Sequence, residues 1–320
     1  MVKYVKVLVI VDMEGASGLD DVRKCSPISG PLYQEGRSLV TEDLNAAIRG
    51  LKIGGATEIH VIDSHGGGEP PNLILGKIES EAKVLGGETV ALGLLFSRAL
   101  ASYDAFALVG LHSMAATVGG FLAHTSTGRV ALRVNGRFVG EIEWLAWAAG
   151  YFGVPTILVT GDAAAVREAK AFLPGVEGAA VKTAIAGDKV ECLPLNEART
   201  LIQEAAARAL KNIKDHRAYT VPAPIQLDVM FASPGEANMA FIIPGVKQTD
   251  DRTVTYVADD YVEALRAFFT ALRLFSVYTQ GAIVARIQDM EPVKKVMNEH
   301  YEEIRRKRLS EPPPFPPVEY

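Results

Sequence analysis

The chain opens with a dense apolar run that ends in two acidic residues, Val5-Lys6-Val7-Leu8-Val9-Ile10-Val11-Asp12-Met13-Glu14-Gly15. β-Branched and aliphatic residues at this density are typical of a strand buried on both faces of a sheet. In extended backbone Asp12 and Glu14 point to the same side, so they can bind one cation together. Ligand sites of open α/β sheets lie at the carboxyl ends of strands, which makes this pair the first candidate site. The alternative is that Asp12 only caps the strand and Glu14 is solvated.

The segments that follow predict a parallel sheet with crossover helices. Apolar residues recur at helical spacing over residues 33–50, and Gly54-Gly55 supplies a helix stop. Residues 57–63 form a second expected strand, so strand, helix and strand make a right-handed parallel βαβ unit. Further buried strands are expected at residues 104–110 and 155–160. The N-terminal lobe is therefore expected to be α/β, with a mostly parallel sheet.

The pattern changes after about residue 190. An amphipathic helix is expected at residues 196–213, beginning at an Asn196 cap. Strands at residues 225–231 and 253–257 follow, and then a helix at residues 261–277. This order predicts a second, smaller α+β lobe.

The tail differs from both lobes. Residues 291–308 predict a charged helix, and residues 311–317 predict a stiff, polyproline-like end. The expected division of the chain is a metal-binding α/β catalytic lobe (1–190), an α+β lobe (191–285) and a helical, Pro-rich C-terminal extension (286–320).

Composition narrows the class of protein. A net charge of -5 argues against nucleic-acid binding, which needs a basic surface. Cys25 and Cys192 are the only cysteines, too few for a disulfide framework or a thiolate zinc site, and they suit a reducing compartment. The start of the chain lacks the apolar region of a signal peptide, and its first strand is too short to span a bilayer, so we expect a cytoplasmic protein without a membrane partner. Trp144 and Trp147, with long apolar runs in both lobes, predict a homo-oligomer.

Two loops carry further candidate residues. Residues 114–127 are small and Gly-rich and contain His124, which suits a loop that approaches a substrate closely. Residues 129–141 predict a hairpin around Asn135-Gly136. Glu141 then begins a helix, where an acidic residue often only complements the helix dipole.

Several familiar catalytic motifs are absent from the sequence. It contains no G-x-G-x-x-G after a strand, no Walker loop and no H-E-x-x-H helix. Asp63-Ser64-His65 suggests a serine hydrolase, but the members of a catalytic triad are rarely adjacent in sequence and a G-x-S-x-G nucleophile elbow is missing. What remains is a set of groups of the metal-ligand type at strand ends and a helix start: Asp12, Glu14, His65, His112 and Glu141.

Three carboxylates and two imidazoles suit a pair of divalent ions that share one carboxylate. Zinc is the first expectation, because imidazole with carboxylate is a common zinc environment. A metal-dependent amidase or phosphoesterase could use the same ligands. A peptide-binding oligomer that keeps metal only for structure is the non-enzymatic alternative.

At this point the motifs resemble a known family, the D-aminopeptidases of bacterial dipeptide-transport operons, peptidase family M55. The resemblance extends to roughly residue 280. Five motifs carry it: Val11-Asp12-Met13-Glu14-Gly15-Ala16-Ser17-Gly18, Asp63-Ser64-His65, Gly110-Leu111-His112, a Gly-x-x-x-His motif from Gly120 to His124, and Val139-Gly140-Glu141. Members cleave a D-amino acid from the N-terminus of short peptides and form self-compartmentalising rings, decamers in the best-known case.

The resemblance also implies roles for individual residues. Asp12, Glu14, His65, His112 and Glu141 match the ligands of two zinc ions, with Asp12 bridging. His124 matches the proposed catalytic nucleophile or base, and we favour acid/base transfer because a neutral imidazole moves protons in both directions near neutral pH. Glu143 departs from the family, which usually has a small residue there, so a substrate pocket of altered size or charge is expected. The extension beyond about residue 285 also exceeds the family pattern.

Overall fold

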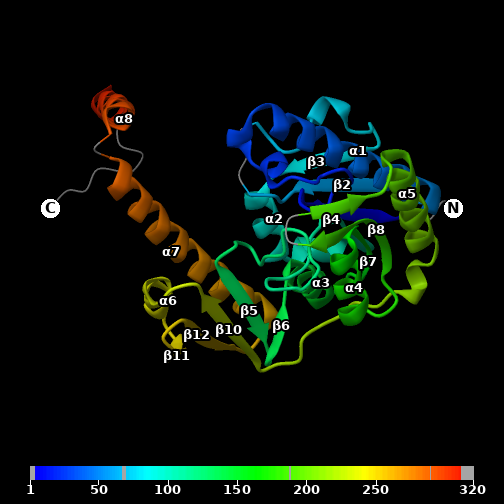
Figure 1. Ribbon diagram of the computed structural model, residues 1–320. Coiled ribbons are helices and arrows are strands. Elements are labelled where there is room, and N and C mark those ends of the chain that lie inside the picture. Colours follow the sequence, from blue (N-terminus) through cyan, green and yellow to red (C-terminus); the bar gives the residue numbers. More distant parts are fainter. Residues whose placement is uncertain (1–3, 67–69, 187–188, 289, 311–320) are drawn as a thin grey trace.

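The computed structural model describes residues 4–66, 70–186, 189–288 and 290–310 and contains two sheets (Figure 1). The strands of the larger sheet are β1 (Lys6–Val11), β2 (Glu58–Asp63), β3 (Ala82–Gly86), β4 (Ala105–Leu111), β7 (Thr156–Asp162), β8 (Glu177–Ala186) and β9 (Lys189–Cys192). Their order is β3-β2-β1-β4-β7-β8-β9, and every neighbouring pair is parallel except β8 and β9. The expected mostly parallel α/β sheet is confirmed.

Strand β1 lies between β2 and β4 and is buried on both faces, as its sequence predicts. Val7, Val9 and Val11 pack in one core cluster, together with residues of α1 (Pro31–Gly54) and α5 (Leu195–Lys211). Leu8 and Ile10 pack in the other cluster. The helices on that second face are α2 (Glu88–Leu95), α3 (Glu141–Tyr151) and α4 (Ala163–Phe172). The parallel pairing brings the carboxyl ends of β2, β1 and β4 to one edge of the sheet.

The smaller sheet is antiparallel. Its strands, in the order β11-β12-β10-β5-β6, are β5 (Val130–Val134), β6 (Arg137–Val139), β10 (Ile225–Phe231), β11 (Lys247–Asp250) and β12 (Thr253–Ala258). The predicted hairpin is confirmed, because Asn135 and Gly136 both have positive φ, 48° and 81°, as a tight two-residue turn requires. Helices α6 (Pro234–Phe241) and α7 (Tyr261–Ile287) pack on this sheet.

The two sheets pack on one common core, and segments from before and after residue 190 contribute to both parts of the structure. Leu132 of β5, Val229 of β10 and Phe268 of α7 belong to the same buried cluster as Leu8 of β1. Helix α5 comes after residue 190 in the chain but packs on α1, which comes before it. The two helices are so close that a Cβ on Gly50 of α1 would lie 2.2 Å from the carbonyl oxygen of Gln203 of α5. The β5–β6 hairpin precedes residue 190 but belongs to the smaller sheet. The division of the chain into domains at residue 190 stays a prediction.

One local prediction was wrong, and several elements were not predicted. Helix α5 begins at Leu195 with Pro194 in the capping position, so Asn196 is not its cap. The β8–β9 hairpin and α6 lie where the sequence pattern is weak. The structure also has short 3₁₀ helices at Val22–Cys25, Pro27–Ser29, Leu75–Lys77, Arg98–Ser102 and Ile213–Asp215.

Helix α7 runs beyond its predicted end and projects away from both sheets, carrying the charged helix α8 (Glu291–Ser310) at its far end (Figure 1). By length and composition alone, α7 is apolar enough to cross a membrane. Its first half is instead a core helix, since Tyr261, Phe268 and Phe275 are buried in the main cluster. The predicted polyproline segment at residues 311–317 lies outside the described residues.

Candidate metal centre

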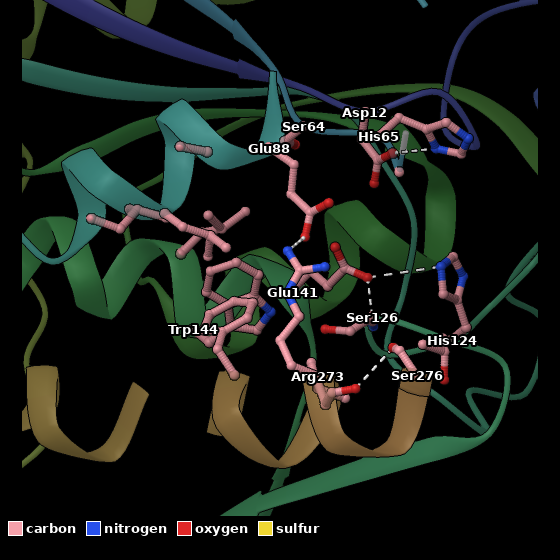
Figure 2. Close-up of a pocket in the computed structure, with 18 of the residues that line it drawn as sticks. Asp12, Ser64, His65, Glu88, His124, Ser126, Glu141, Trp144, Arg273 and Ser276 are labelled. Atoms are coloured by element: carbon pink, nitrogen blue, oxygen red, sulfur yellow. Dashed lines mark hydrogen bonds and ion pairs between the residues drawn. The ribbon is translucent and has the colours of Figure 1, made fainter. Parts of the chain in front are cut away.

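The structure brings all five predicted ligands to one place. Asp12 and Glu14 follow β1, His65 follows β2, and His112 follows β4, so the parallel sheet alone gathers four of them. Glu141 is the first residue of α3 and directly follows the hairpin of the smaller sheet. Figure 2 shows Asp12 and His65 on one side of this site and Glu141 with His124 on the other.

The first group of ligands consists of Asp12, Glu14 and His65. His65 Nδ1 lies 3.1 Å from Asp12 Oδ1 and 3.1 Å from Glu14 Oε2. Its Nε2 lies 3.0 Å from the carbonyl oxygen of Cys25, a partner that can only accept a hydrogen bond. This contact fixes the ring and leaves Nδ1 facing the two carboxylates.

The second group consists of His112, His124 and Glu141. His112 Nδ1 donates to the carbonyl oxygen of Ser113, and His124 Nδ1 donates to that of Leu122. Both rings therefore present Nε2 to Glu141 Oε1, at 3.3 Å and 3.8 Å. The two rings stack with centroids 3.8 Å apart.

Asp12 connects the two groups. Its Oδ1 faces His65, whereas its Oδ2 lies 3.4 Å from His112 Nε2. The side chain is almost fully buried, so neither oxygen is turned to bulk water. A carboxylate whose two oxygens face two separate groups has the arrangement that a bridging ligand needs.

The site gathers several buried ionisable groups, and they shift the pKa values of one another. Burial, and then the charge of Glu14, raises the pKa of Asp12 to about 6. Burial opposes protonation of His112, but Glu141 and Asp12 outweigh it and raise the pKa of the imidazole to about 10. Burial alone would raise the pKa of Glu14. The charge of His65 and its hydrogen bond outweigh burial and hold this pKa well below its usual value. Without a metal, these histidines compensate the carboxylates as cations.

The residues fit a metal ion. His112 is 1% exposed, yet its Nε2 has no hydrogen-bond partner among the described residues and points between Asp12 and Glu141. At 3.4 Å and 3.3 Å from these carboxylates the nitrogen makes ion-pair contacts but no hydrogen bond, so a metal ion held between the three groups would satisfy it better. Carboxylate and imidazole donors without thiolate suit zinc.

A cavity of about 350 Å³ opens beside the ligands. Part of its wall is apolar, formed by Ala91, Leu95, Trp144, Phe269 and Leu272. Arg273 of α7 and Glu88 of α2 form a 3.0 Å ion pair at the wall (Figure 2). The cavity thus combines charged ligands with a surface that an apolar side chain can contact.

Glu143 does not shape this cavity, so the expectation based on it was wrong. The side chain is fully buried on the far side of the α3 N-terminus, where Oε2 accepts a hydrogen bond from Gly140 N at 2.6 Å. It pairs there with Glu168 of α4. Sequence reasoning also missed Lys182, although a lysine after the apolar residues Ala179 to Val181 is an unusual signal within a strand.

Comparisons with known proteins identify the family of this chain. Residues 5–270 match the family model described as D-aminopeptidase of peptidase family M55. A curated D-aminopeptidase of Bacillus subtilis (strain 168) is 35% identical over 274 residues, which cover 84% of this chain and 97% of that relative. The solved structure of the zinc-dependent D-aminopeptidase DppA from Bacillus subtilis, described as a self-compartmentalizing protease, is similar with a TM-score of 0.78 and 32% identity, over 85% of this chain and 98% of that one. The chain therefore belongs to the D-aminopeptidase family, peptidase family M55.

Proposed function

We propose that this protein is a dizinc aminopeptidase that removes N-terminal D-amino acids from short peptides. Glu14 and His65 would hold one ion, His112 and Glu141 the other, and Asp12 would bridge them. The observation that carries the proposal is the division of the two Asp12 oxygens between the two ligand groups. The zinc dependence of the similar solved structure supports the choice of metal.

The residues of the chain suit peptide hydrolysis. When bound, zinc supplies Lewis acidity at the substrate carbonyl and makes water a competent nucleophile near neutral pH. His124 is the proton carrier: its Nδ1 donates to Leu122, so its Nε2 is free to take a proton from water and return it to the leaving amine. The apolar wall near Trp144 would contact the side chain of the first substrate residue.

The preference for D-amino acids rests on membership of the family. We further propose that the chain forms a homo-oligomer in the cytoplasm, and that this assembly is a decameric ring. The description of the similar structure as a self-compartmentalizing protease supports an assembly. The cysteine content supports a reducing compartment.

One assay tests the proposal against its alternatives. The zinc-loaded protein is given matched D-alanyl and L-alanyl peptides, simple amides and phosphate esters, while the metal content per chain is measured. We expect two zinc ions per chain and faster hydrolysis of the D-alanyl peptides. Faster cleavage of phosphate esters or simple amides would favour another metal-dependent hydrolase, and two bound ions without turnover of any substrate would favour a structural metal site.

A further inference from the structure

A buried lysine holds the turn that carries Glu14. Lys182 of β8 is 2% exposed, and its Nζ reaches across to the residues that follow β1. It lies 2.5 Å from the carbonyl oxygen of Glu14, 3.0 Å from that of Ala16 and 2.6 Å from that of Leu19. The described residues contain no carboxylate in ion-pair contact with it. The ammonium is satisfied by backbone oxygens instead.

Three acceptors match the three N–H bonds of an ammonium group. A turn whose carbonyl groups converge on one point needs a donor there, because buried carbonyl groups without a partner are costly. The ring of Phe121 covers the same ammonium, with its centroid 4.7 Å from Nζ. Lys182 therefore serves the turn as a fixed internal cation.

The rest of the turn is held just as tightly. Asp43 of α1 accepts hydrogen bonds from the backbone nitrogen of Ser17 at 2.7 Å and from its hydroxyl at 2.5 Å. Gly15 N donates to the carbonyl oxygen of Gly110 at 2.8 Å, and a Cβ on Gly15 would lie 1.9 Å from the carbonyl oxygen of Leu111. Lys182 holds the other end of the same peptide group, because it donates to the carbonyl oxygen of Glu14 while Gly15 N donates to Gly110.

We propose that Lys182 is a positioning residue that orients Glu14, and with it the first ligand group, toward its zinc ion; this inference rests on the proposed function. Fixing the carbonyl group of Glu14 fixes the direction in which its side chain leaves the backbone. Glu14 Oε2 then stays 3.1 Å from His65 Nδ1. His112, which follows β4, and Glu141, which begins α3, have no hydrogen bond to Lys182, so the effect falls on the ion that Glu14 would hold.

The test compares Lys182→Met with a matched control, Lys24→Met. Lys24 is 7% exposed and contacts the same turn, with Nζ 3.3 Å from the carbonyl oxygen of Gly18, but it pairs with Asp20 and Glu35 and does not touch Glu14. Each protein is stripped of metal and titrated with zinc against a competing chelator. Cobalt(II) spectra report the coordination of each ion, and the melting temperature reports stability.

We expect both variants to melt at lower temperature than the wild type, and only Lys182→Met to bind one of its two zinc ions about 10-fold more weakly or worse, the lower end of the usual effect of groups that support ligands. The cobalt spectrum of that ion should change too. Wild-type affinities for both ions in Lys182→Met, or equal weakening in both variants, would overturn the inference. If Lys182→Met does not fold, Lys182→Leu, which also removes the donor, decides by the same criterion. A wild type that binds fewer than two ions would instead refute the proposed function itself.

Discussion

Replacing Glu168 by glutamine should change how stability depends on pH. Glu168 and Glu143 are both buried, and each uses one oxygen to accept a backbone hydrogen bond, from Met114 N at 2.8 Å and from Gly140 N at 2.6 Å. The two carboxyl groups interact with each other. The second oxygen of each has no other hydrogen-bond partner among the described residues. This contact is favourable only when a proton lies between them.

The size of the effect follows from proton linkage. Burial, and then the charge of Glu143, raises the pKa of Glu168 from 4.5 to about 9. Below about pH 4.5 both the folded and the unfolded chain hold this proton, and its contribution to stability is complete. Above that value only the folded chain holds it, so stability is lost as pH rises toward about 9. One proton corresponds to about 1.4 kcal/mol per pH unit, so the loss of stability between pH 6 and pH 8 is about 3 kcal/mol.

A glutamine at position 168 imitates the protonated acid, because its carbonyl accepts from Met114 N and its amide donates to Glu143. In urea unfolding at pH 6, 7 and 8, the stability of Glu168→Gln relative to the wild type should rise by about 3 kcal/mol from pH 6 to pH 8. Both proteins keep the same metal ligands, so effects of zinc cancel in the difference. Glu204→Gln, whose parent side chain is 62% exposed, is the control and should show no gain. Parallel stability curves for Glu168→Gln and the wild type would refute the shared proton.

Three further outcomes are expected. Asp12→Ala should lose both zinc ions, because each ligand group loses one of its oxygens, and two tightly bound ions in this variant would contradict the bridge. His124→Ala should keep its metal and lose about 10²-fold or more in kcat; a loss of metal would make His124 a ligand, and an unchanged kcat would exclude the catalytic role. Light scattering at micromolar concentration should report an oligomer, and a monomer would count against the assembly.

The fold and the candidate ligands could be predicted because their signals are local. The apolar run of β1 and the residues that follow each parallel strand can be found in the sequence, and the parallel topology then places Asp12, His65 and His112 at one edge. Asn135-Gly136 predicted its hairpin for the same reason, since positive φ at both positions is a property of those two residues.

The missed features depend on contacts between segments far apart in the chain. Lys182 and Glu14 are 168 positions apart, and no local pattern indicates that they touch. Glu143 was expected to alter the substrate pocket because it stands where the family usually has a small residue. On a helix, however, residues two positions apart point in different directions, and Glu143 interacts with Glu168 instead of facing the cavity beside Glu141. Packing, and not local preference, decided each of these cases.

The smaller sheet has a direct role in the candidate centre. Four predicted ligands follow strands of the larger sheet, but Glu141 begins α3 immediately after β6, whose neighbour β5 pairs with β10. Phe269, Leu272 and Arg273, which line the cavity beside the ligands, come from α7, which packs on the same smaller sheet. A change that unpairs β5 from β10 should therefore displace both Glu141, a candidate ligand, and the α7 residues that line the cavity. The larger sheet supplies most of the candidate metal ligands, and the smaller sheet completes the candidate centre and places it against a cavity.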